Sequence, residues 1–227
     1  MCGIAGIVGL KGSPVSMIED RLKRMGTMLG HRGPDQEGVY ISNDRMVGIF
    51  NNRLAIVGIS SKIRLPMRSQ DNNYLLSFNG EIYNHNNLRK QLILEGCNFI
   101  SHTDTEVLHN GLISHGIDYL QHLDGMWGFA FIDQNKKNIH LSRDVLGEKP
   151  LYYYIGESEL IFCSEVAPIL AVMKNEPEWE DEAIVCSFQY RSAPPGKTLI
   201  KGVYRLHGGE TLTVDYKHNN IHSSYCK

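Results

Sequence analysis

The sequence contains no long hydrophobic run. Its longest apolar stretches, such as residues 126–132, fall far short of the roughly 20 residues that a helix needs to cross a bilayer. A signal peptide is not visible either, because no basic segment precedes the first apolar residues, and Lys11 and Gly12 interrupt them early. We therefore expect a soluble, cytoplasmic protein that has no contact with a membrane.

Charge of one sign is not in excess. The 227 residues carry 23 Lys and Arg against 25 Asp and Glu, which gives a net charge of −2. A domain that binds nucleic acid needs a basic surface, so this balance predicts no nucleic-acid partner. The length corresponds to one large domain or two small ones and suffices to bury a substantial core.

Cysteine is also scarce. The five cysteines are widely scattered and form no C-x-x-C pair, which argues against a disulfide framework and against a cysteine-rich zinc site. A reducing compartment is the simpler inference. None of the ten histidines has H-E-x-x-H spacing, so the sequence predicts no metal site.

Hydrophobic periodicity predicts one α+β domain with short, mostly antiparallel strands. Helices come in adjacent pairs instead of alternating with strands, which disfavours a doubly wound parallel sheet. Strands are predicted at 3–9, 39–42, 46–50, 53–58, 74–80, 126–133, 138–144, 150–156 and 160–165. Helices are predicted at 15–30, 86–96, 103–116, 165–173 and 181–191. Residues 202–216 are predicted to form a hairpin around Gly208-Gly209, followed by a polar, frayed tail at 217–227.

The second residue is a cysteine, and a side chain this small permits removal of Met1. Cys2 would then carry both a thiol and a free α-amine. An unperturbed α-amine has a pKa of roughly 7.7–8.0, so it can accept a proton near neutral pH. A thiol beside a base is an activated nucleophile. The alternative is a small hydrophobic residue that begins an edge strand.

Four further residues, at three places in the chain, have two interpretations each. Arg53 can form a bidentate pair with a substrate carboxylate or a surface salt bridge. Asn79 and Gly80 can supply oxyanion donors, although Asn-Gly is also a strong hairpin signal. Asp104 can bind an ammonium group or complement a helix dipole.

Other motifs are interpreted as structural. Residues 31–35 predict a rigid loop in which Arg32 and Asp35 pair with neighbours, so His31 is not needed as a base. Residues 143–144 predict a turn between strands. Thr103 and Glu106 fit a capping box at the start of the helix at 103–116.

Several motifs together carry a resemblance to a known family. They lie at residues 1–9, 31–35, 52–58, 78–85, 103–107, 123–133, 142–153 and 194–212. In this order they resemble the glutaminase domain of glutamine-hydrolysing asparagine synthetases and, more broadly, the class II glutamine amidotransferases, which are N-terminal nucleophile hydrolases. The match runs from Met1 to about Asp215.

The resemblance implies a four-layer αββα sandwich of two antiparallel sheets. It implies a domain at 1–216, with 217–227 as a polar tail that begins a linker to an absent synthetase domain. Cys2 is implied as the nucleophile that attacks the side-chain amide of L-glutamine, and its α-amine as the base. Asn79 and Gly80 are implied as the oxyanion hole. A retained Met1 would block this amine.

The resemblance also implies how glutamine is held. Arg53 would bind its α-carboxylate, and Glu81 and Asp104 would face its α-ammonium. The pocket would be lined by Leu54, Ile56 and Val57. One departure is Gly58, where the family commonly has aspartate.

No Ser-Gly-Gly-x-Asp-Ser loop occurs in the sequence. We therefore expect no cofactor in this chain, and ATP and magnesium only in an absent synthetase domain or subunit that is its partner. Association into a homodimer stays open. The leading hypothesis is a glutaminase that supplies ammonia for asparagine synthesis, and an apolar patch is expected on the face that meets the synthetase. The alternatives are the same chemistry for a sugar or secondary-metabolite acceptor, hydrolysis of other amides, and a non-catalytic glutamine-binding regulatory module.

Overall fold

The computed structural model describes residues 1–54 and 64–226. The strands are β1 Gly3–Gly9, β2 Gln36–Ile41, β3 Val47–Arg53, β4 Met67–Arg68, β5 Tyr74–Ile82, β6 Gly125–Asp133, β7 Asn138–Arg143, β8 Tyr152–Ile155, β9 Glu159–Cys163, β10 Val203–Arg205, β11 Glu210–Asp215 and β12 Asn220–Tyr225. The helices are α1 Ile18–Leu29, α2 His85–Leu94, α3 Asp104–His115, α4 Val166–Val172 and α5 Asp181–Tyr190, with a 3₁₀ helix η1 at Gly116–His122.

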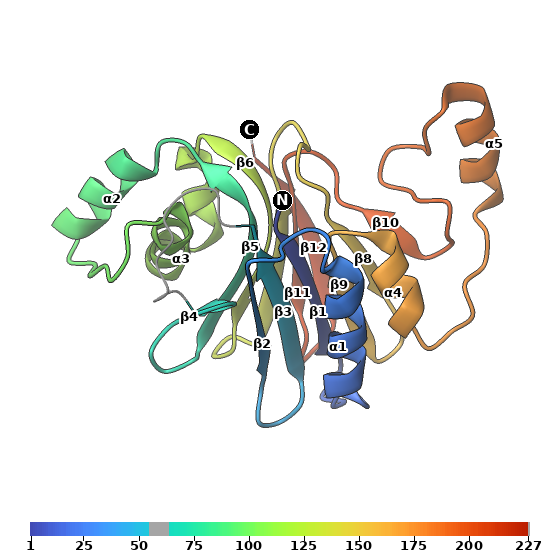
Figure 1. Ribbon diagram of the computed structural model, residues 1–227, viewed down its shortest axis with the longest axis horizontal. Helices are drawn as coiled ribbons and strands as arrows, with labels where there is room; N and C mark the ends of the chain where they lie inside the picture. Colours follow the sequence, from blue (N-terminus) through green and yellow to red (C-terminus); the bar gives the residue numbers. More distant parts are fainter. Residues whose placement is uncertain (55–63, 227) are drawn as a thin grey trace.

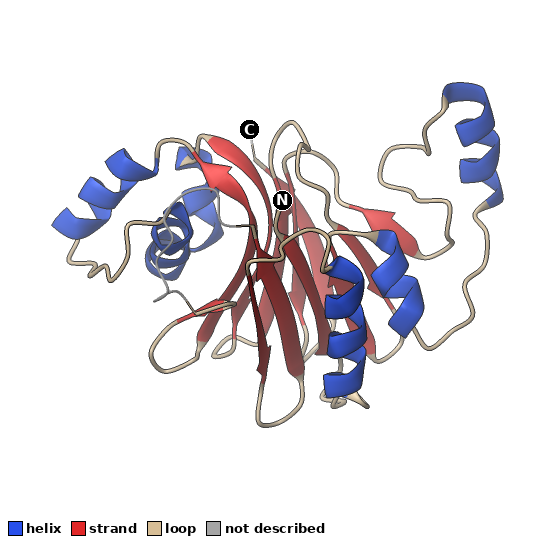
Figure 2. Ribbon diagram, viewed as in Figure 1, coloured by secondary structure: helices blue, strands red, loops and turns tan. Residues whose placement is uncertain are grey.

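Two six-stranded sheets pack face to face between helices (Figure 1 and Figure 2). One sheet has the order β10-β8-β9-β1-β3-β2 and the other β12-β11-β7-β6-β5-β4. The described strands pair with their neighbours in antiparallel ladders. Helices α1 and α4 cover the outer face of the first sheet, and α2 and α3 cover that of the second. The predicted αββα sandwich of two antiparallel sheets is therefore confirmed.

Strand β1 shows why the sheets stack in this way. Its even residues Ile4 and Val8 join the cluster between the sheets, whereas Ala5 and Ile7 join the cluster under α1 and α4. Successive side chains of a strand point to opposite faces, so a strand covered on both faces is apolar throughout. The continuous apolar run at the N-terminus therefore predicts a central strand, which β1 is.

The hairpin predicted at 202–216 is wrong. Val203–Arg205 (β10) pairs with β8 in one sheet, and Glu210–Asp215 (β11) pairs with β7 in the other. Gly208 and Gly209 thus carry the chain from one sheet to the other, with Gly209 at a φ of 75°. The Gly-Gly signal correctly marks a turn, but the strand partners come from distant parts of the chain.

The polar segment near the end of the chain is not frayed. Asn220–Tyr225 forms β12, which pairs with β11 over six positions and lies at the edge of its sheet with all six residues exposed. An edge strand needs only one neighbour, and polar side chains suit its solvent-facing position. The prediction of a disordered tail is therefore corrected for these six residues.

The remaining boundaries agree with the sequence pattern to within a few residues. Thr103 caps α3 by accepting a hydrogen bond from the Glu106 N–H, and Gly116 follows the last residue of the helix. The strand predicted at 53–58 lies outside the described residues after Leu54. In the parts of the chain described, no helix is long and apolar enough to span a membrane.

Candidate active site

Cys2 lies immediately before β1, at one end of the sandwich. Gly3 is opposite Asn52 in the antiparallel pair of β1 and β3, so Cys2 and Arg53 are the next residues along adjacent strands. The Cys2 side chain is half-buried. Cys163, by contrast, is fully buried, and burial raises the pKa of its thiol to about 12. Cys163 therefore cannot serve as a thiolate nucleophile near neutral pH.

Two consecutive asparagines hold the start of β1. The Gly3 N–H donates to Asn52 Oδ1 at 2.6 Å, and Asn51 Nδ2 donates to the Gly3 carbonyl at 3.1 Å. Asn51 Oδ1 also accepts from the N–H of Phe78 in the other sheet, at 3.3 Å. Asn51 thus ties the strand that begins after Cys2 to the residue that precedes Asn79. These two asparagines were not among the predicted site residues, although two amides ending an apolar strand are an unusual pattern.

Asn79 and Gly80 do not form a hairpin turn. Strand β5 continues through both residues to Ile82, and Gly80 lies opposite Trp127 of β6. The Asn79 side chain is 2% exposed, and its Nδ2 has no hydrogen-bond partner among the described residues. A buried donor without a partner is costly, and in a native protein it calls for an explanation such as an absent ligand.

Gly80 is required by the close approach of β6. A Cβ atom at this position would lie 2.2 Å from the Met126 carbonyl oxygen and 2.8 Å from the Phe78 ring. No side chain fits there without moving the backbone of β6. The residue type is therefore dictated by packing as well as by any role in catalysis.

Asp104 connects the start of α3 to the end of β5. Its Oδ2 accepts from the Ile82 N–H at 3.0 Å, and its Oδ1 accepts from the Thr105 N–H at 2.7 Å. The bond from the Thr105 N–H lies at the N-terminus of α3, so Asp104 complements the helix dipole there, as one of the two interpretations of the sequence expected. The first bond places Asp104 next to Glu81, so two carboxylates lie beside the strand that carries Asn79.

The surroundings of Glu81 are acidic. Desolvation raises the pKa of the exposed Tyr83 phenol, and the negative charges of Glu148, Glu81 and Asp124 raise it further. These carboxylates are therefore near one another at the same end of the sandwich. Such a field favours a cationic group of a ligand.

Arg53 is the last residue of β3, the strand that pairs with β1. Its carbonyl accepts from the Asp35 N–H at 3.2 Å, and Gly33 packs on its backbone so tightly that a Cβ would lie 2.6 Å from Arg53 N. The loop at 31–35 thus fixes the backbone of Arg53. Leu54 follows and is half-buried. Two predicted pocket residues, Ile56 and Val57, lie outside the described residues, as does Gly58.

The loop at 31–35 is also held from α4. Arg32 and His31 both bind Glu165, the latter at 2.9 Å between His31 Nε2 and Glu165 Oε1. Burial alone would raise the pKa of Glu165, but the hydrogen bonds from Arg32 and His31 keep it below its ordinary value. The prediction that this loop is structural is confirmed for Arg32, and His31 is engaged in an ion-pair contact.

The predicted turn at 143–144 is confirmed as a structural support. Asp144 is buried and accepts hydrogen bonds from the N–H groups of Glu148 at 2.8 Å and Lys149 at 3.0 Å. Its carboxylate also accepts from the Trp127 N–H at 3.3 Å. This network braces the part of β6 that lies against Gly80. Among the described residues, no group of His, Cys, Asp and Glu side chains is arranged to hold a metal ion.

The fold as a whole matches known amidotransferase structures. The glutamine phosphoribosylpyrophosphate amidotransferase from Bacillus subtilis, solved with ADP and GMP, superposes with a TM-score of 0.65 at 19% identity, over 99% of this chain and 49% of that one. At this identity the similarity concerns the fold alone. The two chains share the same sandwich fold.

Residues 1–226 match the family model of the glutamine amidotransferase domain. The chain belongs to the class II glutamine amidotransferases. It is 33% identical to a putative glutamine-hydrolysing asparagine synthetase 2 of Methanocaldococcus jannaschii, over 99% of this chain and 46% of that protein. It is 29% identical to the amidase chry2 of Gibberella zeae, over 93% of this chain and 32% of that protein. The chain thus spans less than half the length of these relatives.

Proposed function

We propose that this chain hydrolyses L-glutamine to glutamate and ammonia, with Cys2 as the nucleophile after removal of Met1. The observation that carries the proposal is the buried, unpartnered amide of Asn79 on the strand that Asn51 ties to the start of β1. A donor kept dry and without a partner is arranged for a charge that develops during a reaction. Family membership supports glutamine as the substrate.

The proposed reaction needs only groups at this end of the sandwich. The thiol of Cys2 attacks the side-chain carbonyl carbon of glutamine, and its proton passes to the α-amine. Asn79 Nδ2 and the Gly80 N–H stabilise the tetrahedral oxyanion. The α-amine then protonates the leaving nitrogen, so that ammonia departs and a glutamyl thioester remains. Water attacks this thioester, which releases glutamate and restores the thiol.

The zwitterionic end of glutamine requires one fixed cation and one fixed anion. We propose that Arg53 binds the α-carboxylate in a bidentate pair and that Glu81 and Asp104 hold the α-ammonium. Asp104 Oδ1 already accepts from the N–H and the hydroxyl of Thr105, but Oδ2 accepts only from the Ile82 N–H among the described residues and has a second lone pair for the ligand. Leu54, Ile56 and Val57 complete the proposed pocket.

The test is glutamate release from L-glutamine by the purified chain, with the N-terminal mass measured on the same sample. Protein that lacks Met1 should release glutamate, and Cys2→Ala should abolish the release without loss of fold. Cys97→Ala is the matched control, because Cys97 is also a free, half-buried cysteine. Full activity of Cys2→Ala would exclude the proposed nucleophile. Glutamine binding without turnover by correctly processed protein would support a regulatory binding module instead.

We further propose that the ammonia passes to an ATP-dependent synthetase partner that makes asparagine from aspartate. ATP and magnesium would bind to that partner in the cytoplasm, and this chain would need no cofactor. The asparagine synthetase among the relatives supports this acceptor. The amidase from Gibberella zeae supports the second candidate, which is the same glutaminase chemistry with another acceptor. Mass spectrometry of the product formed from amide-¹⁵N glutamine, ATP, magnesium and aspartate by the chain with its partner separates the two.

A further inference from the structure

Residues 174–202 form an arm that stands apart from the sandwich (Figure 1). The outgoing and returning segments of the arm are joined near its base by two backbone hydrogen bonds. The Glu180 N–H donates to the Leu199 carbonyl at 2.9 Å, and the Lys201 N–H donates to the Glu178 carbonyl at 2.9 Å. Helix α5, Asp181–Tyr190, lies at the far end. It packs extensively against no other described helix or strand.

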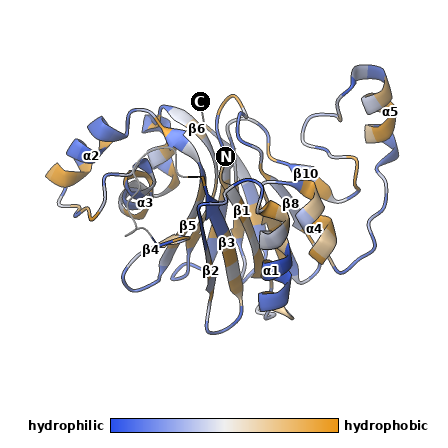
Figure 3. Ribbon diagram, viewed as in Figure 1, coloured by the Kyte–Doolittle hydropathy of each residue, from blue (hydrophilic) through white to orange (hydrophobic). Residues whose placement is uncertain are grey.

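Helix α5 exposes apolar side chains together with the polar Asp181, Glu182 and Gln189. Phe188 is 86% exposed, and Val185 and Tyr190 are also exposed, whereas Ala183 is the one fully buried residue of this helix. Figure 3 shows that α5 carries both hydrophobic and hydrophilic residues and lies remote from the sheets. Trp179 adds a further exposed aromatic side chain at the base of the helix. A helix of ten residues is marginal in water on its own, so burial against a partner would supply the missing stability.

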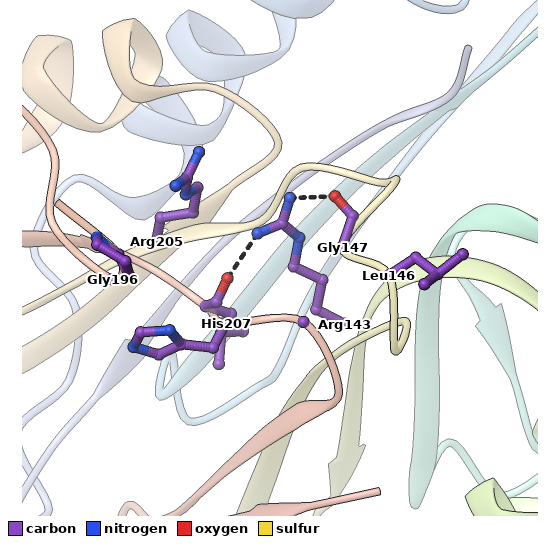
Figure 4. A pocket seen from close by; sticks show the side chains of 9 residues that line it. Arg143, Leu146, Gly147, Gly196, Arg205 and His207 are labelled. Carbon is purple, nitrogen blue, oxygen red and sulfur yellow. Dashed lines mark hydrogen bonds between the residues drawn. The ribbon is translucent and has the colours of Figure 1, made fainter. Parts of the chain in front are cut away.

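A pocket of about 310 Å³ opens between the base of the arm and the loop after β7 (Figure 4). Arg143 lines it, but this guanidinium is fully engaged with the carbonyls of Lys149, Leu206 and Gly147. Arg205 lines it as well: its backbone N–H donates to the Gly196 carbonyl at 2.9 Å, but its guanidinium makes no hydrogen bond or ion pair with another described residue. Burial lowers the pKa of Arg143, and the positive charge of Arg205 lowers it further. The pocket therefore holds two like charges, and neither guanidinium forms a salt bridge with a described carboxylate, although Asp144 lies close enough to raise the pKa of Arg143.

The other rim of the pocket is apolar and lies next to the last described residues. Leu146 is 83% exposed, and its neighbour Val145 is exposed too. The Cys226 N–H donates to the Gly209 carbonyl at 2.8 Å, and Gly209 in turn packs beside Val145. The pocket, the loop at 145–146 and the strand that ends at Tyr225 thus form one continuous surface with the arm.

We propose that this surface, which comprises α5, the Arg205 pocket and Val145–Leu146, is the docking site of the synthetase partner. The inference rests on the proposed function. The relatives are more than twice as long as the segment that matches this chain, which supports a synthetase domain as the occupant of this surface. The partner would cover α5 with apolar side chains and place an acidic group against Arg205, because the Arg205 guanidinium forms no ion pair with a described residue of this domain.

The test uses the chain together with its synthetase, either as one continuous protein or as the two-subunit complex. Benzoylphenylalanine replaces Phe188, and irradiation links it to whatever covers α5. The matched control is position 94 on α2, since Leu94 is 88% exposed and lies on the opposite side of the sandwich. Crosslinks from position 188 to synthetase peptides, with none from position 94, are the expected result.

Two results would overturn the proposal. Crosslinks from position 188 to a second copy of this domain would make α5 a dimer surface, and an absence of crosslinks would leave α5 exposed in the complete protein. Glutamate release is measured on the same samples. Glutamate release without crosslinks to the synthetase refutes the docking site but not the glutaminase activity. Crosslinks to the synthetase without glutamate release refute the glutaminase activity but not the docking site.

A second measurement separates docking from chemistry. Phe188→Asp should leave glutamate release unchanged but abolish transfer of glutamine nitrogen to the synthetase product, because Phe188 is remote from Cys2. Leu94→Asp should leave both unchanged. Arg205→Gln should weaken association and reduce its dependence on salt, since it removes one charge from the interface. Unimpaired nitrogen transfer by both Phe188→Asp and Arg205→Gln would contradict the proposal.

Discussion

The side-chain oxygen of Asn51 accepts a hydrogen bond from the backbone N–H of Phe78, at 3.3 Å, across the two sheets. The same side chain donates to the carbonyl of Gly3, next to Cys2. One buried amide therefore determines how far the proposed nucleophile lies from the strand that carries the proposed oxyanion hole. This relationship makes Asn51 a positioning residue.

Asn51→Ala should lower kcat on the order of 10- to 100-fold, because small displacements of reacting groups have effects of this size. The matched control is Ser77→Ala, since Ser77 Oγ also links the sheets, by donating to the Phe50 carbonyl at 3.2 Å, but lies farther from Asn79. Both variants should lose on the order of 1–3 kcal/mol of unfolding free energy. Equal kcat values for the two variants would reduce Asn51 to a structural role.

Asn79→Ala should lower kcat by about 10²–10³, the typical effect of removing one oxyanion donor. Its free energy of unfolding should not fall, because the Asn79 Nδ2 has no partner to lose among the described residues. Steady-state kinetics and chemical denaturation on the same preparation measure both quantities. A large loss of stability with activity retained would indicate a structural amide.

Arg53→Ala should raise KM for glutamine far more than it changes stability, because the proposed pair with the α-carboxylate exists only with substrate bound. Arg53→Lys should recover part of the affinity, since lysine keeps the charge but not the bidentate geometry. Arg24→Ala, at an exposed position on α1, is the control and should leave KM unchanged. An unaltered KM in Arg53→Ala would assign Arg53 to a surface pair.

Acidification should destabilise the fold through His140. Burial lowers the pKa of His140 to about 4 from an ordinary value of 6.5, and its Nδ1 lies 2.9 Å from Thr213 Oγ1. Between these two pH values the unfolded chain binds a proton that the folded chain does not, so the free energy of unfolding falls as the pH drops from 6.5 towards 4. The slope from this residue is at most about 1.4 kcal/mol per pH unit.

Denaturation curves at several pH values test the role of His140. His140→Gln should flatten the pH dependence in this window, whereas His102→Gln, at an exposed position, should not. The same slope in His140→Gln and in the unmodified chain would mean that other groups cause the acid sensitivity.

Local sequence was sufficient to predict an element wherever the residues of that element alone decide its structure. The apolar run at 3–9 predicts a strand covered on both faces, and Thr103 and Gly116 mark the ends of α3 through capping and a positive φ. Periodicity likewise predicts the five α-helices and most of the longer strands, but not β4, η1 or β12. The antiparallel sandwich was expected only through the family resemblance, because periodicity does not say which strands pair.

Pairing between distant strands was decided by the tertiary structure. The Gly208-Gly209 signal is local, but β10 and β11 find their partners in different sheets. Asn-Gly at 79–80 is a hairpin signal, yet β6 pairs with β5 straight through it. The polar residues 220–225 have no local reason to be ordered and become a strand because β11 offers a free edge.

The sequence by itself determined the proposed chemistry of the candidate site, because a cysteine at position 2, an arginine and carboxylates follow from residue types and motifs. Only the tertiary structure brought in Asn51 and Asn52, buried the Asn79 Nδ2 without a partner among the described residues, and separated α5 from the core. These features depend on contacts between residues far apart in the chain, such as Asn51 and Phe78. Such contacts form only once two sheets have packed, and no local pattern encodes them.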